Sequence, residues 1–103
     1  MSTVVSRKSP SGPASIVYEE VSVDFGAINP STVASQTLSV PGVNVGDVVM
    51  ANPQQAIDDR LVMRFPFIPA DDQVTIQVRN SGPGVVDPAV ITWDLAIIKS
   101  GAA

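Results

Sequence analysis

A chain of 103 residues has room for one domain with a single hydrophobic core. Apolar residues make up 45% of the chain, as in an ordinary globular domain, whereas charged residues make up only 16%, less than such a domain usually carries. A low content of charged residues favours a protein that covers part of its surface with partners. The chain contains no cysteine and no histidine, which excludes disulfides, thiolate zinc sites and histidine-dependent catalytic triads within one chain.

The net charge of −4 is unevenly distributed along the chain. Residues 1–18 carry Arg7 and Lys8 and no acid, while the rest carries four bases and ten acids. Because phosphate contacts need clustered Lys and Arg side chains, we expect this acidic body to bind no nucleic acid. No apolar run approaches the roughly 20 residues of a membrane helix, and the N-terminus lacks the apolar segment of a signal peptide. We therefore expect that the protein contacts no membrane and that it is synthesised in the cytoplasm.

Residues 1–16 are predicted to form an extended N-terminal arm. Serine, proline and glycine dominate residues 6–15, and so few apolar side chains cannot build a core. We expect that a partner orders this arm, with Arg7 and Lys8 docking on an acidic surface. Val4 and Val5 would add an apolar or strand-pairing contact. The alternative is that the arm is a solvated tail.

From residue 17 onward the pattern is that of β-strands. Val21, Val23 and Phe25 alternate with polar residues, which is the period of a half-buried strand. Turn-forming sequences separate the apolar stretches, most clearly PGVNVGD at 41–47. Residues 54–59 could form a loop or a single helical turn. Further strands are predicted over residues 36–40, 48–50, 61–68, 74–79 and 91–98.

The two strands with the clearest alternation are expected to supply the core. We expect six of their side chains to be buried: Val74, Ile76, Val78, Trp93, Leu95 and Ile97. An exposed Trp93 beside Tyr18 could instead stack on a sugar ring, but the phase of Trp93 favours core packing. Short strands and frequent turns, with no sustained helical period, predict an all-β fold. We expect a small antiparallel β-sandwich, jelly-roll-like, over residues 17–103.

The densest apolar cluster lies within residues 61–68, which Pro66 interrupts. Since proline cannot donate to a central ladder, we expect this strand to lie at a sheet edge or to bend there. Phe65, Phe67 and Ile68 could pack in the core or contact a neighbouring subunit, because unpaired edges invite association. The subunit contact is the candidate site.

Three acidic pairs remain as possible chemistry: Glu19-Glu20, Asp58-Asp59 and Asp71-Asp72. Adjacent residues of a strand point to opposite faces, so the first pair should not share a site. The other two pairs lie in predicted loops, where they could bind a hard cation such as calcium or simply be solvated turn residues. We favour solvated turns, and we expect no metal, no cofactor, no catalytic residue and no enzyme activity.

The sequence LSVPGVNVGDVV at residues 38–49 is followed by Asn-Pro at 52–53 and by a strand at 74–80 that ends in asparagine. A glycine-rich turn, Asp-Pro-Ala at 87–89 and a terminal strand complete the pattern. In these features residues 37–99 resemble a family of small bacteriophage virion proteins that decorate heads or form parts of tails and fibres. The markers of this family are turn residues and strand alternation, and it has no active site.

The resemblance implies a β-sandwich that works in several copies on a virion. We expect a capsid decoration (cement) protein, a homotrimer that binds the major capsid protein or other virion proteins and stabilises the assembled head. One alternative is a tail or fibre module, including one that binds a receptor or a glycan. Another is a bacterial adhesion domain or an enzyme-accessory β-domain.

Overall fold

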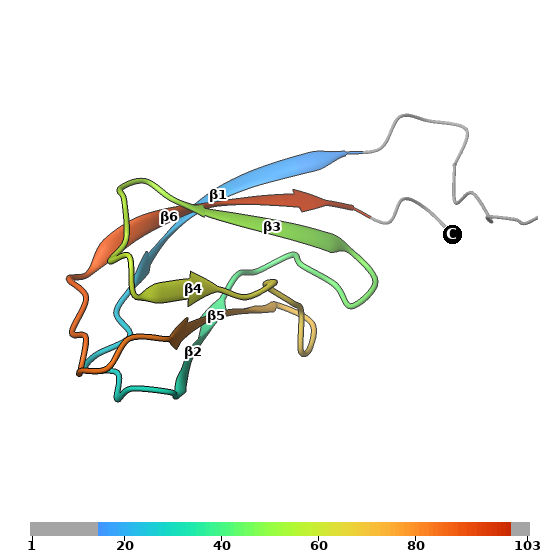
Figure 1. Ribbon diagram of the computed structural model, residues 1–103. Helices are drawn as coiled ribbons and strands as arrows, with labels where there is room; N and C mark the ends of the chain where they lie inside the picture. The colour runs from blue at the N-terminus through green and yellow to red at the C-terminus, as the bar shows by residue number, and fades with distance from the viewer. Residues whose placement is uncertain (1–14, 100–103) are drawn as a thin grey trace, which may run out of the picture.

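The computed structural model describes residues 15–99, which fold into six strands and no helix (Figure 1). The strands are Ile16–Val23 (β1), Val33–Ser39 (β2), Val48–Pro53 (β3), Leu61–Met63 (β4), Gln73–Asn80 (β5) and Ile91–Ile98 (β6). They form two three-stranded antiparallel sheets, with the orders β1-β6-β3 and β2-β5-β4. The predicted all-β antiparallel sandwich is confirmed, and residues 54–59 form a loop rather than a helical turn.

The chain changes sheet at four of its five connections, since only β4 and β5 are consecutive strands of the same sheet. The last two strands fill the centres of the sheets, β5 between β2 and β4, and β6 between β1 and β3. This wrapping of early strands around late ones is the jelly-roll pattern, with fewer strands than the full motif. As a result, β1, β2, β3 and β4 are all edge strands of the described fold.

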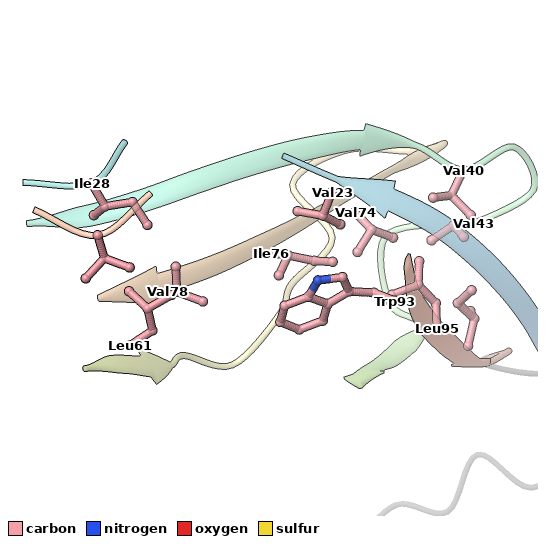
Figure 2. Packing of buried hydrophobic residues seen from close by; sticks show 12 residues of the cluster. Val23, Ile28, Val40, Val43, Leu61, Val74, Ile76, Val78, Trp93 and Leu95 are labelled. Carbon is pink, nitrogen blue, oxygen red and sulfur yellow. The ribbon is translucent and has the colours of Figure 1, made fainter. Parts of the chain in front are cut away.

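The core lies between the two sheets, and its largest side chains come from the two central strands (Figure 2). All six side chains predicted to be buried are at most 1% exposed. Phe25 packs edge-to-face on Trp93, with ring centroids 6.3 Å apart. Tyr18 is 74% exposed on the opposite side of the sheet, so the alternative of a sugar-stacking platform with Trp93 is wrong.

The proline in the fourth apolar stretch has the predicted effect. The strand β4 ends at Met63, before Pro66, and pairs only with β5. Pairing with β5 resumes at Phe67, whose N–H donates to Thr75 O at 3.1 Å and whose carbonyl accepts from Thr75 N–H at 2.8 Å. The segment between β4 and Phe67 is therefore held at both ends while its middle bulges from the sheet edge.

Candidate functional site

The outer face of the β1-β6-β3 sheet carries exposed apolar side chains where a solvated sheet face normally carries polar ones. Two register rows cross all three strands, and we call their six residues the apolar face: Ile16, Ile98 and Val48, then Tyr18, Ala96 and Met50. Four of the six are at least 50% exposed, and Tyr18 is the most exposed. Burial of such surface contributes roughly 25 cal/mol per Å² of apolar area, so the apolar face gains free energy when a partner covers it.

The outer face of the other sheet is polar by contrast. The hydroxyls of Thr37 and Thr75 lie 2.9 Å apart in a hydrogen bond, and Gln77 Nε2 donates to Ser35 Oγ at 2.9 Å. Side chains that pair in this way on a sheet surface need no further partner. Val33 and Val62 are also exposed on this face, but the register places Arg79 between them. The apolar face, in contrast, runs uninterrupted across three strands, and such areas mark sites of protein contact.

Two carboxylates border the apolar face. Glu20 and Asp94 are register partners, two residues along their strands from the row of Tyr18. Gln54 Nε2 donates to both, at 2.8 Å to Glu20 Oε2 and at 2.9 Å to Asp94 Oδ1. The amide thus holds together two like charges that would otherwise repel each other. Within residues 15–99 neither carboxylate forms an ion pair, so the apolar face ends in a negative border.

An apolar groove of about 750 Å³ adjoins this face at the open edge of the sandwich, beside β3 and the end of β4. Its apolar lining comes from β3 and from the segment around the end of β4: Val49, Met50, Ala51, Met63, Phe65, Pro66 and Phe67. Phe65 is 93% exposed and Phe67 is 44% exposed. Met50 belongs both to the groove and to the apolar face, so the two surfaces are continuous.

The candidate interface residues separate into two groups. Phe65 and Phe67 lie outside the core and line the groove. Ile68 is partly buried and packs against the core cluster instead. A subunit contact through these residues stays a prediction, in which the two phenylalanines are the accessible members.

The candidate arm residues Val4, Val5, Arg7 and Lys8 lie outside the described residues. The strand β1 begins at Ile16, one residue before the predicted start of the sandwich. Ile16, the last residue of the predicted arm, is therefore part of the sandwich and of the apolar face.

The sequence did not predict that the six residues of the apolar face form one surface. A signal for it exists in β6, whose outward positions change from Thr92 and Asp94 to Ala96 and Ile98. The run at Val48–Pro53 shows the same signal, because Val48 and Met50 leave apolar side chains in the outward phase. These residues become one surface only through the pairing of β6 with both of its neighbours.

The acidic pair at 71–72 is structural. Asp71 Oδ1 accepts from Val45 N–H at 2.9 Å, and Asp72 Oδ1 accepts from Gly42 N–H at 2.8 Å. Both carboxylates thereby fix the loop between β2 and β3, in which Gly42 has φ of 93°. The description of this pair as solvated turn residues is incomplete, because their charges are used to bind backbone amides.

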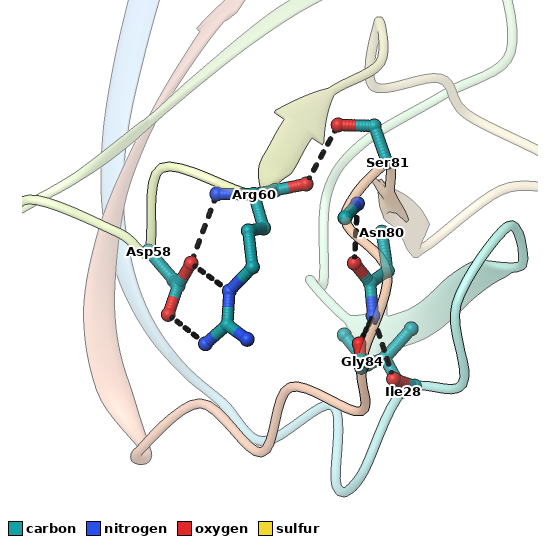
Figure 3. Close-up of polar contacts among 7 residues, drawn as sticks. Ile28, Asp58, Arg60, Asn80, Ser81 and Gly84 are labelled. Atoms are coloured by element: carbon teal, nitrogen blue, oxygen red, sulfur yellow. Dashed lines mark hydrogen bonds and ion pairs between the residues drawn. The ribbon is translucent and has the colours of Figure 1, made fainter.

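The acidic pair at 58–59 is engaged through its first member. Asp58 accepts from Arg60 Nε at 2.9 Å and from Arg60 Nη2 at 2.7 Å (Figure 3). These side-chain hydrogen bonds, helped by the bond from the backbone amide of Arg60, lower the pKa of Asp58 to about 2. The stem of Arg60 lies against Gly82, where an added Cβ would come within 2.6 Å of it. The Asp58 carboxylate is therefore paired with the Arg60 guanidinium.

Over residues 15–99, no three acidic side chains come close enough together to hold a metal ion. The same residues contain no helix that could cross a membrane. Comparisons of the chain with protein-family models, with curated proteins and with solved structures found no match.

Proposed function

We propose that this chain is a structural protein of a bacteriophage virion, a capsid decoration protein that binds the assembled head. The observation that supports a binding role is the apolar face, which continues into the groove of Phe65 and Phe67. The resemblance of residues 37–99 to small virion proteins supports the choice of assembly. In this proposal the copies associate through the apolar surfaces, and the arm reaches the major capsid protein.

The proposed mechanism is thermodynamic. A protein that binds the assembled head and not its separate subunits stabilises the head by mass action. The gain is roughly 2.7 kcal/mol per site when the free protein is at one hundred times its Kd. The sandwich supplies a rigid body, and 14 extended residues before Ser15 reach about 46–50 Å.

Deletion of residues 2–14 is expected to leave the melting temperature of the isolated protein almost unchanged but to reduce head binding at least about tenfold. The cut stops before Ser15, because the Ser15 carbonyl accepts from Lys99 N–H at 2.9 Å and belongs to the fold. An arm that binds must offset about 1–2 kcal/mol of backbone entropy per ordered residue, so its contacts must be substantial. Co-sedimentation with heads assembled without the protein measures the loss.

Reversal of both charges, Arg7→Glu with Lys8→Glu, serves as the matched arm variant. It should weaken binding less than the deletion does, and more at low salt than at high salt, because salt screens exposed charges. Full occupancy of heads by the deleted protein would show that the sandwich alone docks. Binding of the intact protein to tails and not to heads would replace this proposal with the tail or fibre module.

A further inference from the structure

The two apolar surfaces of the molecule differ in shape. The apolar face is an area of sheet surface, formed by two register rows that each cross three strands. The groove bears a projecting side chain, Phe65, which at 93% is the most exposed large apolar residue of the described chain. A chain that carries both a projection and an open apolar area can associate with its own copies.

Phe65 is held in its projecting position by the backbone on both sides. Arg64 N–H donates to Gln77 O at 3.0 Å, and Phe67 N–H donates to Thr75 O at 3.1 Å. Pro66 between them restricts the backbone further. A ring presented on such a pinned segment loses little conformational entropy when it binds, and buried aromatic anchors of this kind dominate many protein interfaces.

The charges beside the two surfaces are complementary. Arg64, next to Phe65, is exposed and forms no ion pair within residues 15–99. Glu20 and Asp94 border the apolar face about 7 Å from the row of Tyr18, the rise of two strand residues. Arg64 and Phe65 line the same groove, so a copy that sets Phe65 on the apolar rows can bring the long side chain of Arg64 to both carboxylates.

We propose that a second copy of this chain occupies the apolar face, with its Phe65 on the rows of Ile16 and Tyr18 and its Arg64 beside Glu20 and Asp94. Because the donating and receiving surfaces differ, repetition of the contact in one direction gives a closed ring or an open filament, whereas reciprocal insertion between two copies gives a two-fold dimer. Phe65 projects from the segment after β4, whereas the receiving rows lie on β1, β6 and β3, so each copy can receive one neighbour while it inserts into another. This assignment rests on the proposed use of the apolar face in protein binding, but it does not require a phage head.

Three single substitutions to aspartate test the contact, each measured by sedimentation of the full chain. Phe65→Asp removes the projection, and Val48→Asp places a charge in the receiving face. Val62→Asp is the matched control, because Val62 is an edge-strand valine of similar exposure, 50% against 55% for Val48, on the outer face of the other sheet. We expect the unmodified chain and V62D to sediment as oligomers, and F65D and V48D alone to sediment as monomers of 10.7 kDa.

The decisive sample is an equimolar mixture of F65D and V48D. The two variants together keep one intact pair of surfaces, the receiving face of F65D and the Phe65 of V48D, so the mixture is expected to form a one-to-one dimer. Failure of the mixture to associate would overturn the contact, as would a monomeric unmodified chain at every concentration or loss of assembly in V62D. A β-type far-UV circular dichroism spectrum and a cooperative unfolding transition establish that both variants are folded.

A charge exchange tests the polar half of the contact. Arg64→Glu and Asp94→Arg are each expected to weaken self-association about tenfold, and the double variant is expected to restore it. Additive weakening in the double variant would contradict the pairing of these two residues. If sedimentation gives the expected masses but phage heads do not bind the protein, the proposed function fails and the contact between copies stands. If heads bind monomeric F65D as strongly as the unmodified chain and the mixture stays monomeric, the contact fails and the proposed function stands.

Discussion

Replacement of Asn80 by alanine is expected to lower the free energy of unfolding by about 3–5 kcal/mol. Asn80 ends β5 and is completely buried. Its Nδ2 donates to Ile28 O at 2.9 Å and to Gly84 O at 2.8 Å, and its Oδ1 accepts from Gly82 N–H at 2.9 Å (Figure 3). Each buried polar group left without a partner costs about 1–3 kcal/mol, and a domain of this size is stable by only about 5–15 kcal/mol.

Two variants sharpen the test of Asn80. Asn80→Asp keeps the acceptor for Gly82 but removes both amide donors, and a carboxylate would then face two carbonyl oxygens. We expect this variant to be at least as unstable as N80A. Asn52→Ala, at an exposed position of β3, should change stability by less than about 0.5 kcal/mol. Urea unfolding measures the free energy of unfolding of all three variants. A decrease of less than about 1 kcal/mol for N80A would contradict the role assigned to this side chain.

The second large effect is expected at the pair of Lys99 and Asp47. The Asp47 side chain has no exposed surface, and its Oδ2 accepts from Lys99 Nζ at 2.6 Å and from Asn44 N–H at 2.9 Å. Lys99 Nζ also donates to Gly42 O at 2.6 Å. The ammonium group of Lys99 thus connects the loop between β2 and β3 to the end of β6. Loss of the cation leaves a buried carboxylate without this charge partner, which costs several kcal/mol in comparable pairs.

Lys99→Met is therefore expected to destabilise the fold by about 2–4 kcal/mol, the lower bound reflecting the 25% exposure of the lysine side chain. The double variant Lys99→Met with Asp47→Asn should be more stable than the sum of the two single losses predicts, because the two side chains interact directly. Thermal or urea unfolding of the four proteins gives the coupling energy. A coupling near zero would show that the pair does not stabilise the loop.

Alternation along β5 and β6 was sufficient to predict six buried side chains, but not Ile28, Val43 and Val86, which lie outside the strands. Trp93, Leu95 and Ile97 share one phase of β6, and that phase is buried because β6 is the central strand of its sheet. An edge position or a bend was predicted from Pro66, since a missing N–H is tolerated only where no ladder needs it, and β4 lies at an edge and ends before that proline. These features are local, so a single strand contains the information that specifies them.

The apolar face could not be predicted in this way, because its residues come from three strands. Ile16 and Val48 become neighbours only through Ile98, and the register of β6 with each of its neighbours is set by the whole sandwich. The roles of Asn80 and Lys99 could not be predicted from the sequence either. Their partners, Ile28 and Asp47, lie 52 residues away in sequence, and no short-range pattern identifies them.

The proposed function is tested most directly by the thermal stability of phage heads assembled without this protein. Purified protein added to such heads is expected to raise their disruption temperature, and the rise should saturate when the binding sites are full, as mass action requires. The isolated capsid subunits should bind the protein at least about a hundredfold more weakly than the heads do. Saturated heads that disrupt at the same temperature as bare heads, or heads that bind no protein at all, would contradict the account.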